Sequence, residues 1–220
     1  MDKKEKRAAV REKARGLTAD YRARASADIV TRLILYPYFQ QVKNIFCYVS
    51  MEGEPDTRNI IETAWSMGKK IYVPKCAEGN TMKAVQIRDY DDLEPGTMGI
   101  LEPKDGLPEI DAYKLDLAVI PCVSADPSGH RLGHGAGYYD RFLKGQKMYK
   151  FCLCFEELLS QDIPVTAEDV LMDRVITENR IYNPRMAGNN LLQEIENEEE
   201  PNAAAAAFKK LLHGLFKKHS

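Results

Sequence analysis

The stretch LDLAVIPCVSADPSGHRLGHGAGYYDRFL, residues 115–143, joins three structural signals in one segment. Its first part, Leu115–Pro121, is apolar apart from Asp116. This run is too short for a helix and turn-forming residues bound it, so we expect a buried strand. Aromatic and leucine residues after Gly137 recur at helical spacing and predict a helix directly after the loop. A strand, a glycine-rich turn and a helix N-terminus in this order are typical of sites that hold a phosphate.

The loop between strand and helix carries glycine at alternate positions, Gly133, Gly135 and Gly137. Without Cβ atoms these residues can take positive φ, which lets successive N–H groups converge on one anion. Arg131 and His134 add side-chain donors beside them. The composition of the loop therefore suits an anionic ligand.

The spacing of the glycines alone does not show whether the loop binds a phosphate. It matches neither the dinucleotide fingerprint nor the P-loop, because Gly137 is followed by Tyr138 rather than by Lys and Ser or Thr. Taken alone, it favours phosphate binding and a plain tight turn equally. Asp140, in the first turn of the expected helix, is placed to meet a Mg²⁺ ion bound to a phosphate.

The composition is that of an ordinary globular protein. The chain has 220 residues, 44% of them hydrophobic, and its 31 Lys and Arg nearly balance 33 Asp and Glu. This balance argues against a nucleic-acid-binding protein. No apolar stretch of about 18 residues and no signal-peptide core is present, so we expect a soluble protein of the cytoplasm without a membrane span.

The five cysteines are odd in number and lie mostly in apolar, strand-like runs. This pattern predicts buried, reduced thiols rather than a disulfide framework. Cys152 and Cys154 would share one face of a strand, but no second pair of ligands follows at the spacing of a zinc site.

The N-terminus is rich in basic residues. Lys3, Arg7 and Arg11 fall on one face of an expected helix, where they either meet solvent or converge on a polyphosphate. Thr18 is expected to cap a second helix that Pro37 stops.

The central part of the chain alternates strand and helix patterns. A strand at 44–49, an amphipathic helix closed by Gly68 and a strand at 71–74 predict a β-α-β unit. Further strands are expected at 82–88, 149–155 and 170–177, whereas the segment 92–103 is expected to be a loop. Glu54 follows the first of these strands, and there it either holds a ligand or, together with Asp56, favours the N-terminus of the next helix.

Several of these segments together resemble the 5-formyltetrahydrofolate cyclo-ligase family. They are RLGHGAGYYDRFL after the strand DLAVIPCVSAD, the segment YVSMEGEPDT, and a Lys-x-x-x-Arg pair at the N-terminus. The resemblance spans about residues 3–178. It implies an α/β fold with a three-layer, open, mostly parallel, Rossmann-like sheet and helices on both faces, as in sugar-phosphate isomerases and coenzyme A transferases. It also implies the conversion of 5-formyltetrahydrofolate to 5,10-methenyltetrahydrofolate with ATP and Mg²⁺.

The resemblance implies roles for individual residues. Those expected to bind ATP are Lys3, Arg7, Arg131, Leu132, Gly133, His134, Gly135, Ala136, Gly137, Tyr138 and Tyr139. Those expected to contact the folate are Val49, Glu54, Met98 and Tyr139. Asp140 and Asp169 are expected to hold Mg²⁺, with Asp173 as the alternative second ligand. Arg131, His134 and Asp140 are the expected catalytic residues, although a bystander role for His134 is equally favoured.

Two parts of the chain depart from the family pattern. Ala136 stands where family members commonly carry glycine or lysine, and residues 183–220 form an acidic stretch followed by an amphipathic helix pattern. We therefore expect a catalytic domain at 1–182 and an extension at 183–220, which docks on its own domain or a second subunit, frays, or lies on a membrane surface. A monomer or weak homodimer is expected.

Two other function classes stay open at this level. One is a non-catalytic domain of the same fold that senses a phosphate or nucleotide ligand. The other is a nucleic-acid-associated protein that uses its basic ends; its mark would be weak, steeply salt-dependent binding.

Overall fold

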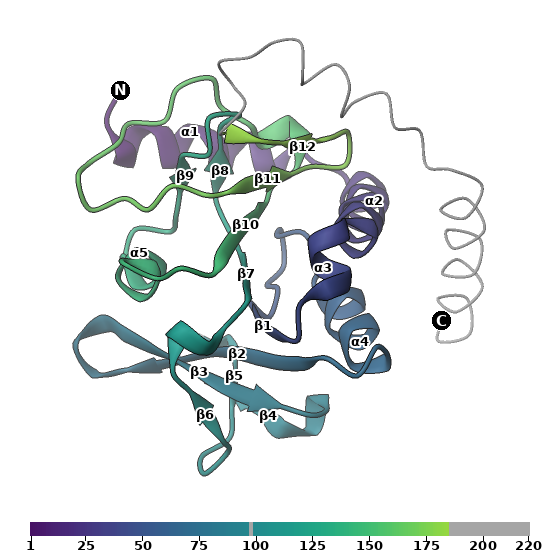
Figure 1. The fold of residues 1–220 in the computed structure, drawn as a ribbon. Helices are drawn as coiled ribbons and strands as arrows, with labels where there is room; N and C mark the ends of the chain where they lie inside the picture. Colours follow the sequence, from purple (N-terminus) through teal and green to yellow (C-terminus); the bar gives the residue numbers. More distant parts are fainter. Residues whose placement is uncertain (97–98, 185–220) are drawn as a thin grey trace. The chain divides into compact units, whose positions relative to one another are not determined.

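The computed structural model describes residues 1–96 and 99–184 (Figure 1). Met98 and all but the first two residues of the expected extension lie outside these ranges. Within the described ranges, no helix combines the length and the apolar character needed to cross a membrane.

An eight-stranded sheet forms the centre of the domain, in the order β12-β11-β10-β7-β1-β2-β3-β6. Its five middle strands are parallel to one another: β1 (Asn44–Cys47), β2 (Lys70–Ala77), β7 (Leu117–Ile120), β10 (Tyr149–Leu153) and β11 (Arg174–Ile176). Antiparallel strands complete both edges: β3 (Thr81–Ile87), β6 (Glu109–Ile110) and β12 (Ile181–Tyr182). The expected mostly parallel sheet is confirmed.

Helices cover both faces of this sheet (Figure 1). They are α1 (Lys3–Arg15), α2 (Ala19–Leu35), α3 (Pro37–Gln41), α4 (Arg58–Ser66) and α5 (Tyr138–Leu143). Figure 1 shows α2, α3 and α4 on one side of the strands and α5 on the other. As expected, Thr18 caps α2, since its Oγ accepts a hydrogen bond from Tyr21 N at 3.1 Å. Pro37 ends this helix and also begins α3, because a missing N–H is harmless in a first turn.

Two strand predictions need correction. The segment 92–103, expected to be a loop, contains the short antiparallel strands β4 (Leu93–Pro95) and β5 (Leu101–Pro103). Gly96 and Gly99 lie between the two strands, Pro95 and Pro103 are strand residues, and Leu93 of β4 is buried. The strand expected at 170–177 is limited to β11, which leaves 170–173 irregular.

Asp116, the one polar residue in the apolar run 115–121, directly precedes β7 and has a structural role. Its Oδ2 accepts hydrogen bonds from Lys43 N at 3.0 Å and Asn44 N at 2.8 Å. The carboxylate therefore links the N-terminal end of β1 to the N-terminal end of β7. A half-buried carboxylate beside a buried strand is stable here because it accepts hydrogen bonds.

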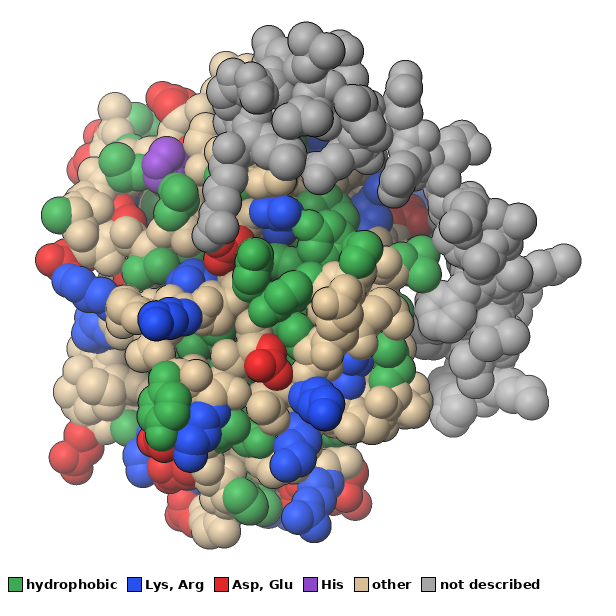
Figure 2. Space-filling view, viewed as in Figure 1, with side chains coloured by type: hydrophobic (Ala, Val, Ile, Leu, Met, Phe, Trp, Pro, Cys, Tyr) green, Lys and Arg blue, Asp and Glu red, His purple; other side chains and the backbone are tan. Residues whose placement is uncertain are grey.

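The surface of the domain mixes charges of both signs. On the face shown in Figure 2, Lys and Arg side chains are interspersed with Asp and Glu side chains. This arrangement differs from the continuous basic stripe by which nucleic-acid-binding domains follow a phosphate backbone.

Phe46 links the core of the sheet to α5. It is fully buried, stacks on Phe142 with ring centroids 4.6 Å apart, and meets Tyr139 edge-on at 6.4 Å. We expect Phe46→Ala to lower the free energy of unfolding by about 3–5 kcal/mol, because it leaves a cavity under α5. Urea denaturation measures this loss. Tyr113→Ala, at a ring that is 71% exposed, is the control and is expected to change stability by less than about 0.5 kcal/mol. Equal losses in both variants would contradict this account of the core.

Candidate functional site

The glycine-rich loop connects a short hairpin to α5. The strand β9 (Arg131–Leu132) pairs with β8 (Ser124–Ala125), and residues 133–137 follow it. Gly135 and Gly137 have φ values of 118° and 73°, as the anion-binding prediction requires. Gly133 does not have a positive φ. Glycine is needed at position 133 for a steric reason, because a Cβ there would lie 2.8 Å from Nη1 of Arg131.

Arg131 is the buried cation of the loop. Its side chain is 3% exposed, Nη1 donates to Pro121 O at 3.3 Å, and Nη2 forms an ion pair with Asp140 Oδ2 at 2.9 Å. Its Nε is buried and has no hydrogen-bond partner among residues 1–96 and 99–184. A buried donor without an acceptor is costly, so this atom marks a place where a ligand oxygen would be stabilising.

Helix α1 brings two predicted basic residues to the loop. Arg7 Nε donates to Gly133 O at 2.7 Å, and Lys3 forms an ion pair with Asp169. Arg11, on the same face of the helix, is exposed. The alternative that this face only meets solvent is therefore wrong for Lys3 and Arg7.

The two carboxylates expected to hold a metal lie in adjoining segments. Asp140 Oδ1 accepts a hydrogen bond from Val170 N at 3.3 Å, so Asp140 lies beside the chain neighbour of Asp169. Burial acts to raise the pKa of Asp169, but hydrogen bonds from Lys3 and Thr166 outweigh it, and the pKa is lowered. Asp169 is thus held as a carboxylate.

The donor set at this position is small. Over residues 1–96 and 99–184, no group of three or more His, Cys, Asp or Glu side chains is arranged to hold a metal. Two carboxylates fit Mg²⁺ only together with phosphate oxygens and water, which is a common way for this ion to bind. Asp173, the alternative second ligand, instead accepts a hydrogen bond from Lys150 N at 3.0 Å at the start of β11.

Glu54 meets the glycine loop through His134. The two side chains are 3.1 Å apart, between Glu54 Oε1 and His134 Nε2, and Glu54 is 8% exposed. Glu54 Oε2 accepts a hydrogen bond from Met51 N at 3.0 Å. Burial, and then the charge of Glu54, raise the pKa of Tyr139, so this tyrosine is a neutral wall of the same site.

The alternative role of Glu54 at a helix N-terminus is filled by another residue. Asp56 Oδ1 accepts a hydrogen bond from Arg58 N at 2.9 Å, at the start of α4. Val49, another expected folate contact, lies two residues after the end of β1 and is half-buried. The segments 49–54 and 131–140, far apart in the sequence, therefore lie in contact through Glu54 and His134.

Asn80 and Arg141 belong to the site, although the sequence analysis did not include them. Arg141 Nε donates to Asn80 O at 2.9 Å, and Nη2 donates to Ala136 O at 2.6 Å. Tyr138 OH donates to Asn80 Oδ1 at 3.2 Å. The tip of the β2–β3 hairpin is thus linked to the glycine loop and α5 by hydrogen bonds of Tyr138 and Arg141. No local signal in the sequence connects residues 79–80 to the loop.

All five cysteines are free thiols. Four of them are buried, as expected, and Cys76 is half-buried. Cys122 packs against Cys152 and Cys154, and these neighbours together with burial raise the pKa of its thiol.

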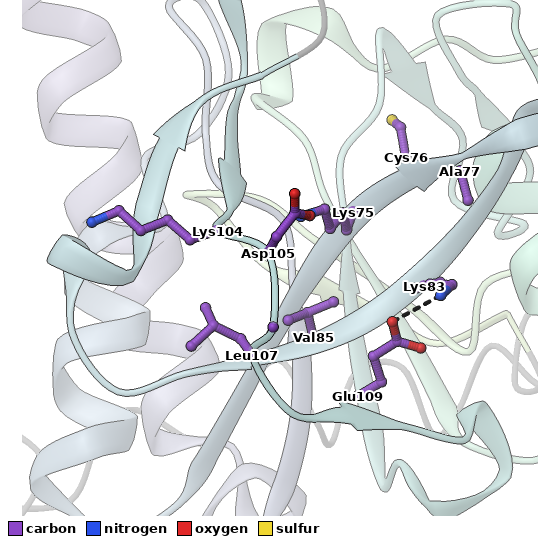
Figure 3. A pocket seen from close by; sticks show the side chains of 10 residues that line it. Lys75, Cys76, Ala77, Lys83, Val85, Lys104, Asp105, Leu107 and Glu109 are labelled. Atoms are coloured by element: carbon purple, nitrogen blue, oxygen red, sulfur yellow. Dashed lines mark hydrogen bonds and ion pairs between the residues drawn. The ribbon is translucent and has the colours of Figure 1, made fainter.

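One cavity lies apart from these residues (Figure 3). It has a volume of about 160 Å³ and lies between the β2–β3 hairpin and residues 104–109. Lys75 Nζ donates to Pro103 O at 2.8 Å and to Asp105 at 2.6 Å, and Lys83 pairs with Glu109 at 2.8 Å. Two of the three lysines that line this cavity, Lys75 and Lys83, therefore already interact with other groups of the protein.

A second cavity, of about 250 Å³, includes Arg131 and Asp169 in its lining. It adjoins the buried guanidinium with the unpartnered Nε. We take it, together with the glycine loop and the Glu54 segment, as the candidate functional site.

Comparisons with known proteins agree on one family. The model of the 5-formyltetrahydrofolate cyclo-ligase family matches residues 1–178. A probable 5-formyltetrahydrofolate cyclo-ligase of Caenorhabditis elegans is 33% identical over 169 residues, which cover 70% of this chain and 82% of the relative. The mouse 5-formyltetrahydrofolate cyclo-ligase is 31% identical, with 79% of this chain and 92% of the relative covered.

Two solved structures of 5,10-methenyltetrahydrofolate synthetases have a similar fold. The structure of the Aquifex aeolicus 5,10-methenyltetrahydrofolate synthetase superimposes with a TM-score of 0.76 at 30% identity, covering 84% of this chain and 94% of that one. A Mycoplasma pneumoniae synthetase superimposes with a TM-score of 0.67 at 19% identity, covering 81% of this chain and 99% of that one; at this identity the likeness shows the fold alone.

Gly137 and Gly145 provide a matched test of the loop, since they flank α5 with φ values of 73° and 75°. Alanine at either position is expected to cost about 1–2 kcal/mol of stability through the left-handed backbone. Only at Gly137 would the new Cβ displace Arg141, which lies 2.7 Å away, whereas Gly145 has open space. We therefore expect Gly137→Ala to weaken calorimetric binding of inorganic tripolyphosphate about tenfold, and Gly145→Ala to leave it unchanged. Similar weakening in both variants would assign the loss to backbone strain alone.

Proposed function

Because this chain belongs to the 5-formyltetrahydrofolate cyclo-ligase family, we propose that it converts 5-formyltetrahydrofolate to 5,10-methenyltetrahydrofolate, using ATP with Mg²⁺ and releasing ADP and phosphate. The observation that carries the proposal is the contact between Glu54 and His134. It joins the segment expected to hold the folate to the loop expected to hold the phosphates. A transfer between two substrates needs this proximity.

The chemistry explains the need for ATP. The formyl carbon on N5 is amide-like and too unreactive for N10 to attack. The formyl oxygen attacks the γ-phosphorus, and the bond from that phosphorus to the bridging oxygen breaks as ADP leaves. N10 then attacks the activated carbon, N10 loses its proton, and the carbon–oxygen bond breaks as phosphate leaves. No side chain needs to become covalently attached, so positioning and charge neutralisation are the work of the protein.

The cations of the site are assigned to the phosphates. Lys3 and Arg7 approach from α1 and Arg131 from within the loop. Arg131 supports this assignment most directly, since a phosphate oxygen would supply the acceptor that its buried Nε lacks. Residues 131–139, including Leu132 and Ala136, would surround the phosphate chain.

The carboxylates are assigned to Mg²⁺. Bound Mg²⁺ would neutralise charge on the phosphates, and Asp140 and Asp169 would hold it. In the ligand-free protein each carboxylate is paired with a cation, Asp140 with Arg131 and Asp169 with Lys3. With Asp140 and Asp169 holding the metal, Arg131 and Lys3 would become available to the phosphates. Metal and nucleotide should therefore bind together.

Glu54 is assigned to the pterin. A carboxylate matches the adjacent N–H donors of the pterin ring, and Glu54 lies almost buried beside Tyr139. Val49 and Tyr139 are proposed as further contacts, as is Met98, which lies outside the described residues. His134, at the boundary of both substrates, is proposed to donate to the transferring phosphoryl group.

We also propose that the protein acts in the cytoplasm as a monomer or weak homodimer, and that it does not bind nucleic acid. A ligand-sensing role remains the second candidate. The presence of Lys3, Arg7 and both aspartates around one loop favours the enzyme, because a sensor has no need for a complete set of phosphate and metal ligands.

Asp169 and Asp162 provide a matched test of the reaction. Asp169 lines the site, whereas Asp162, in the same irregular segment, is 93% exposed and pairs with Lys6. With 5-formyltetrahydrofolate, ATP and Mg²⁺, we expect the wild type to form the methenyl product, followed by its near-ultraviolet absorbance. Asp169→Asn should lower kcat/KM about 100-fold, which is about 2.7 kcal/mol of transition-state stabilisation. Asp162→Asn should match the wild type. No product from the wild type, with ATP still bound, would favour the sensor.

Glu54 and Glu52 separate folate binding from general charge effects. Glu54 is almost buried at the site, whereas Glu52 is exposed in the same loop. Glu54→Gln exchanges one acceptor oxygen for a donor, so we expect KM for 5-formyltetrahydrofolate to rise about tenfold. KM for ATP should stay constant. Glu52→Gln should leave both constants unchanged, and a rise in KM for ATP alone in Glu54→Gln would reassign Glu54 to the nucleotide.

A further inference from the structure

Arg141 holds two main-chain carbonyl groups that belong to different segments. Its Nη2 donates to Ala136 O at 2.6 Å, and its Nε donates to Asn80 O at 2.9 Å. The side chain therefore bridges the glycine loop and the tip of the β2–β3 hairpin. Both bonds end on the main chain, so they constrain the path of the loop directly.

The hairpin tip has a fixed shape of its own. Gly79 and Asn80 both take the left-handed conformation, with φ values of 68° and 55°, and asparagine tolerates this conformation better than most residues do. Tyr138 OH donates to Asn80 Oδ1 at 3.2 Å, and the guanidinium carbon of Arg141 lies 5.7 Å from the centre of the Tyr138 ring. The tip, the guanidinium and the first residue of α5 thus brace one another.

The bond to Ala136 O determines the direction of one peptide group in the loop. The C=O and the N–H of a planar trans peptide point in opposite directions. With Ala136 O directed at Arg141, the N–H of Gly137 is therefore directed away from Arg141. No acceptor for this N–H is found within residues 1–96 and 99–184, so the donor is available to a ligand.

The loop needs such a brace because of its glycines. Gly135 and Gly137 flank Ala136, and glycine permits backbone rotations that other residues resist. If the peptide between Ala136 and Gly137 rotated, a carbonyl oxygen would replace the N–H and repel an anion. A second donor in the loop, the buried Nε of Arg131, already marks the inside of the loop as the place for an anionic ligand.

We propose that Arg141 is a positioning residue of the phosphate loop. Braced by Asn80, it holds Ala136 O away from the anion and keeps the Gly137 N–H directed at it. This inference rests on the proposed function, in which the loop holds phosphates, and adds the residues that maintain its binding conformation. Arg141 acts through the geometry of its hydrogen bonds, since its planar guanidinium serves two carbonyl groups at once.

Lysine at position 141 separates this geometry from charge, because it keeps the charge but lacks the planar fork. We expect Arg141→Lys to raise the calorimetric Kd of inorganic tripolyphosphate with Mg²⁺ about tenfold, the loss expected for one hydrogen bond to a charged group. In nuclear magnetic resonance spectra of the wild type, tripolyphosphate should move the Gly137 amide proton downfield. Arg141→Lys should lose this shift. Arg141 is exposed, so the melting temperature of the variant should stay within about 3 °C of the wild type.

Lys147→Gln is the control for charge, since it removes an exposed cation four residues after the end of α5. It should leave both the Kd and the Gly137 shift unchanged. Wild-type affinity in Arg141→Lys, a Gly137 amide that does not respond in the wild type, or equal weakening by Lys147→Gln would each overturn the inference.

Tripolyphosphate binding and methenyl formation are separate measurements. A protein that forms no methenyl product, but whose tripolyphosphate binding and Gly137 shift depend on Arg141, would refute the proposed reaction and retain the positioning role. A protein that forms the product and binds tripolyphosphate normally as Arg141→Lys would retain the reaction and refute the positioning role.

Discussion

The buried ion pair between Arg131 and Asp140 is the constraint on which the site depends. A guanidinium that is 3% exposed is costly to bury, and it is tolerated because Asp140 neutralises it and Pro121 O accepts one of its donors. These two contacts connect the end of β7 to the first turn of α5. Gly133 must then lack a side chain to leave room for the guanidinium. The course of the glycine loop thus follows from the placement of one charge.

The ligand-free site keeps its charges in pairs. Lys3 pairs with Asp169 and Arg131 pairs with Asp140, and His134 is hydrogen-bonded to Glu54. Such pairs keep the segments in register without a ligand. The same groups are the ones assigned to phosphate, metal and pterin. Substrate binding would then exchange partners within a preformed arrangement, which limits the reorganisation that the reaction requires.

Local patterns in the sequence predicted much of the fold. The apolar run at 115–121, the cap at Thr18 and the amphipathic helix before Gly68 were read correctly, because short-range periodicity and capping chemistry determine them. The hairpin at 93–103 was missed, since its glycines and prolines resemble those of a loop. The clustering of Lys3, Glu54 and Asp169 followed from the family resemblance, whereas the contacts of Asn80 and Arg141 had no local signal. Pairing between residues some sixty positions apart depends on how the sheet is assembled.

The hydrogen bonds of Arg141 to the main chain determine which positions of the loop can vary. Arg141 holds the main-chain oxygens of Asn80 and Ala136 rather than any side chain at those positions. The side chain of residue 136 is exposed and takes no part in these hydrogen bonds. Position 136 can therefore change its chemistry while the backbone keeps its path, which makes it a natural attachment point for a reporter group that senses occupancy of the loop.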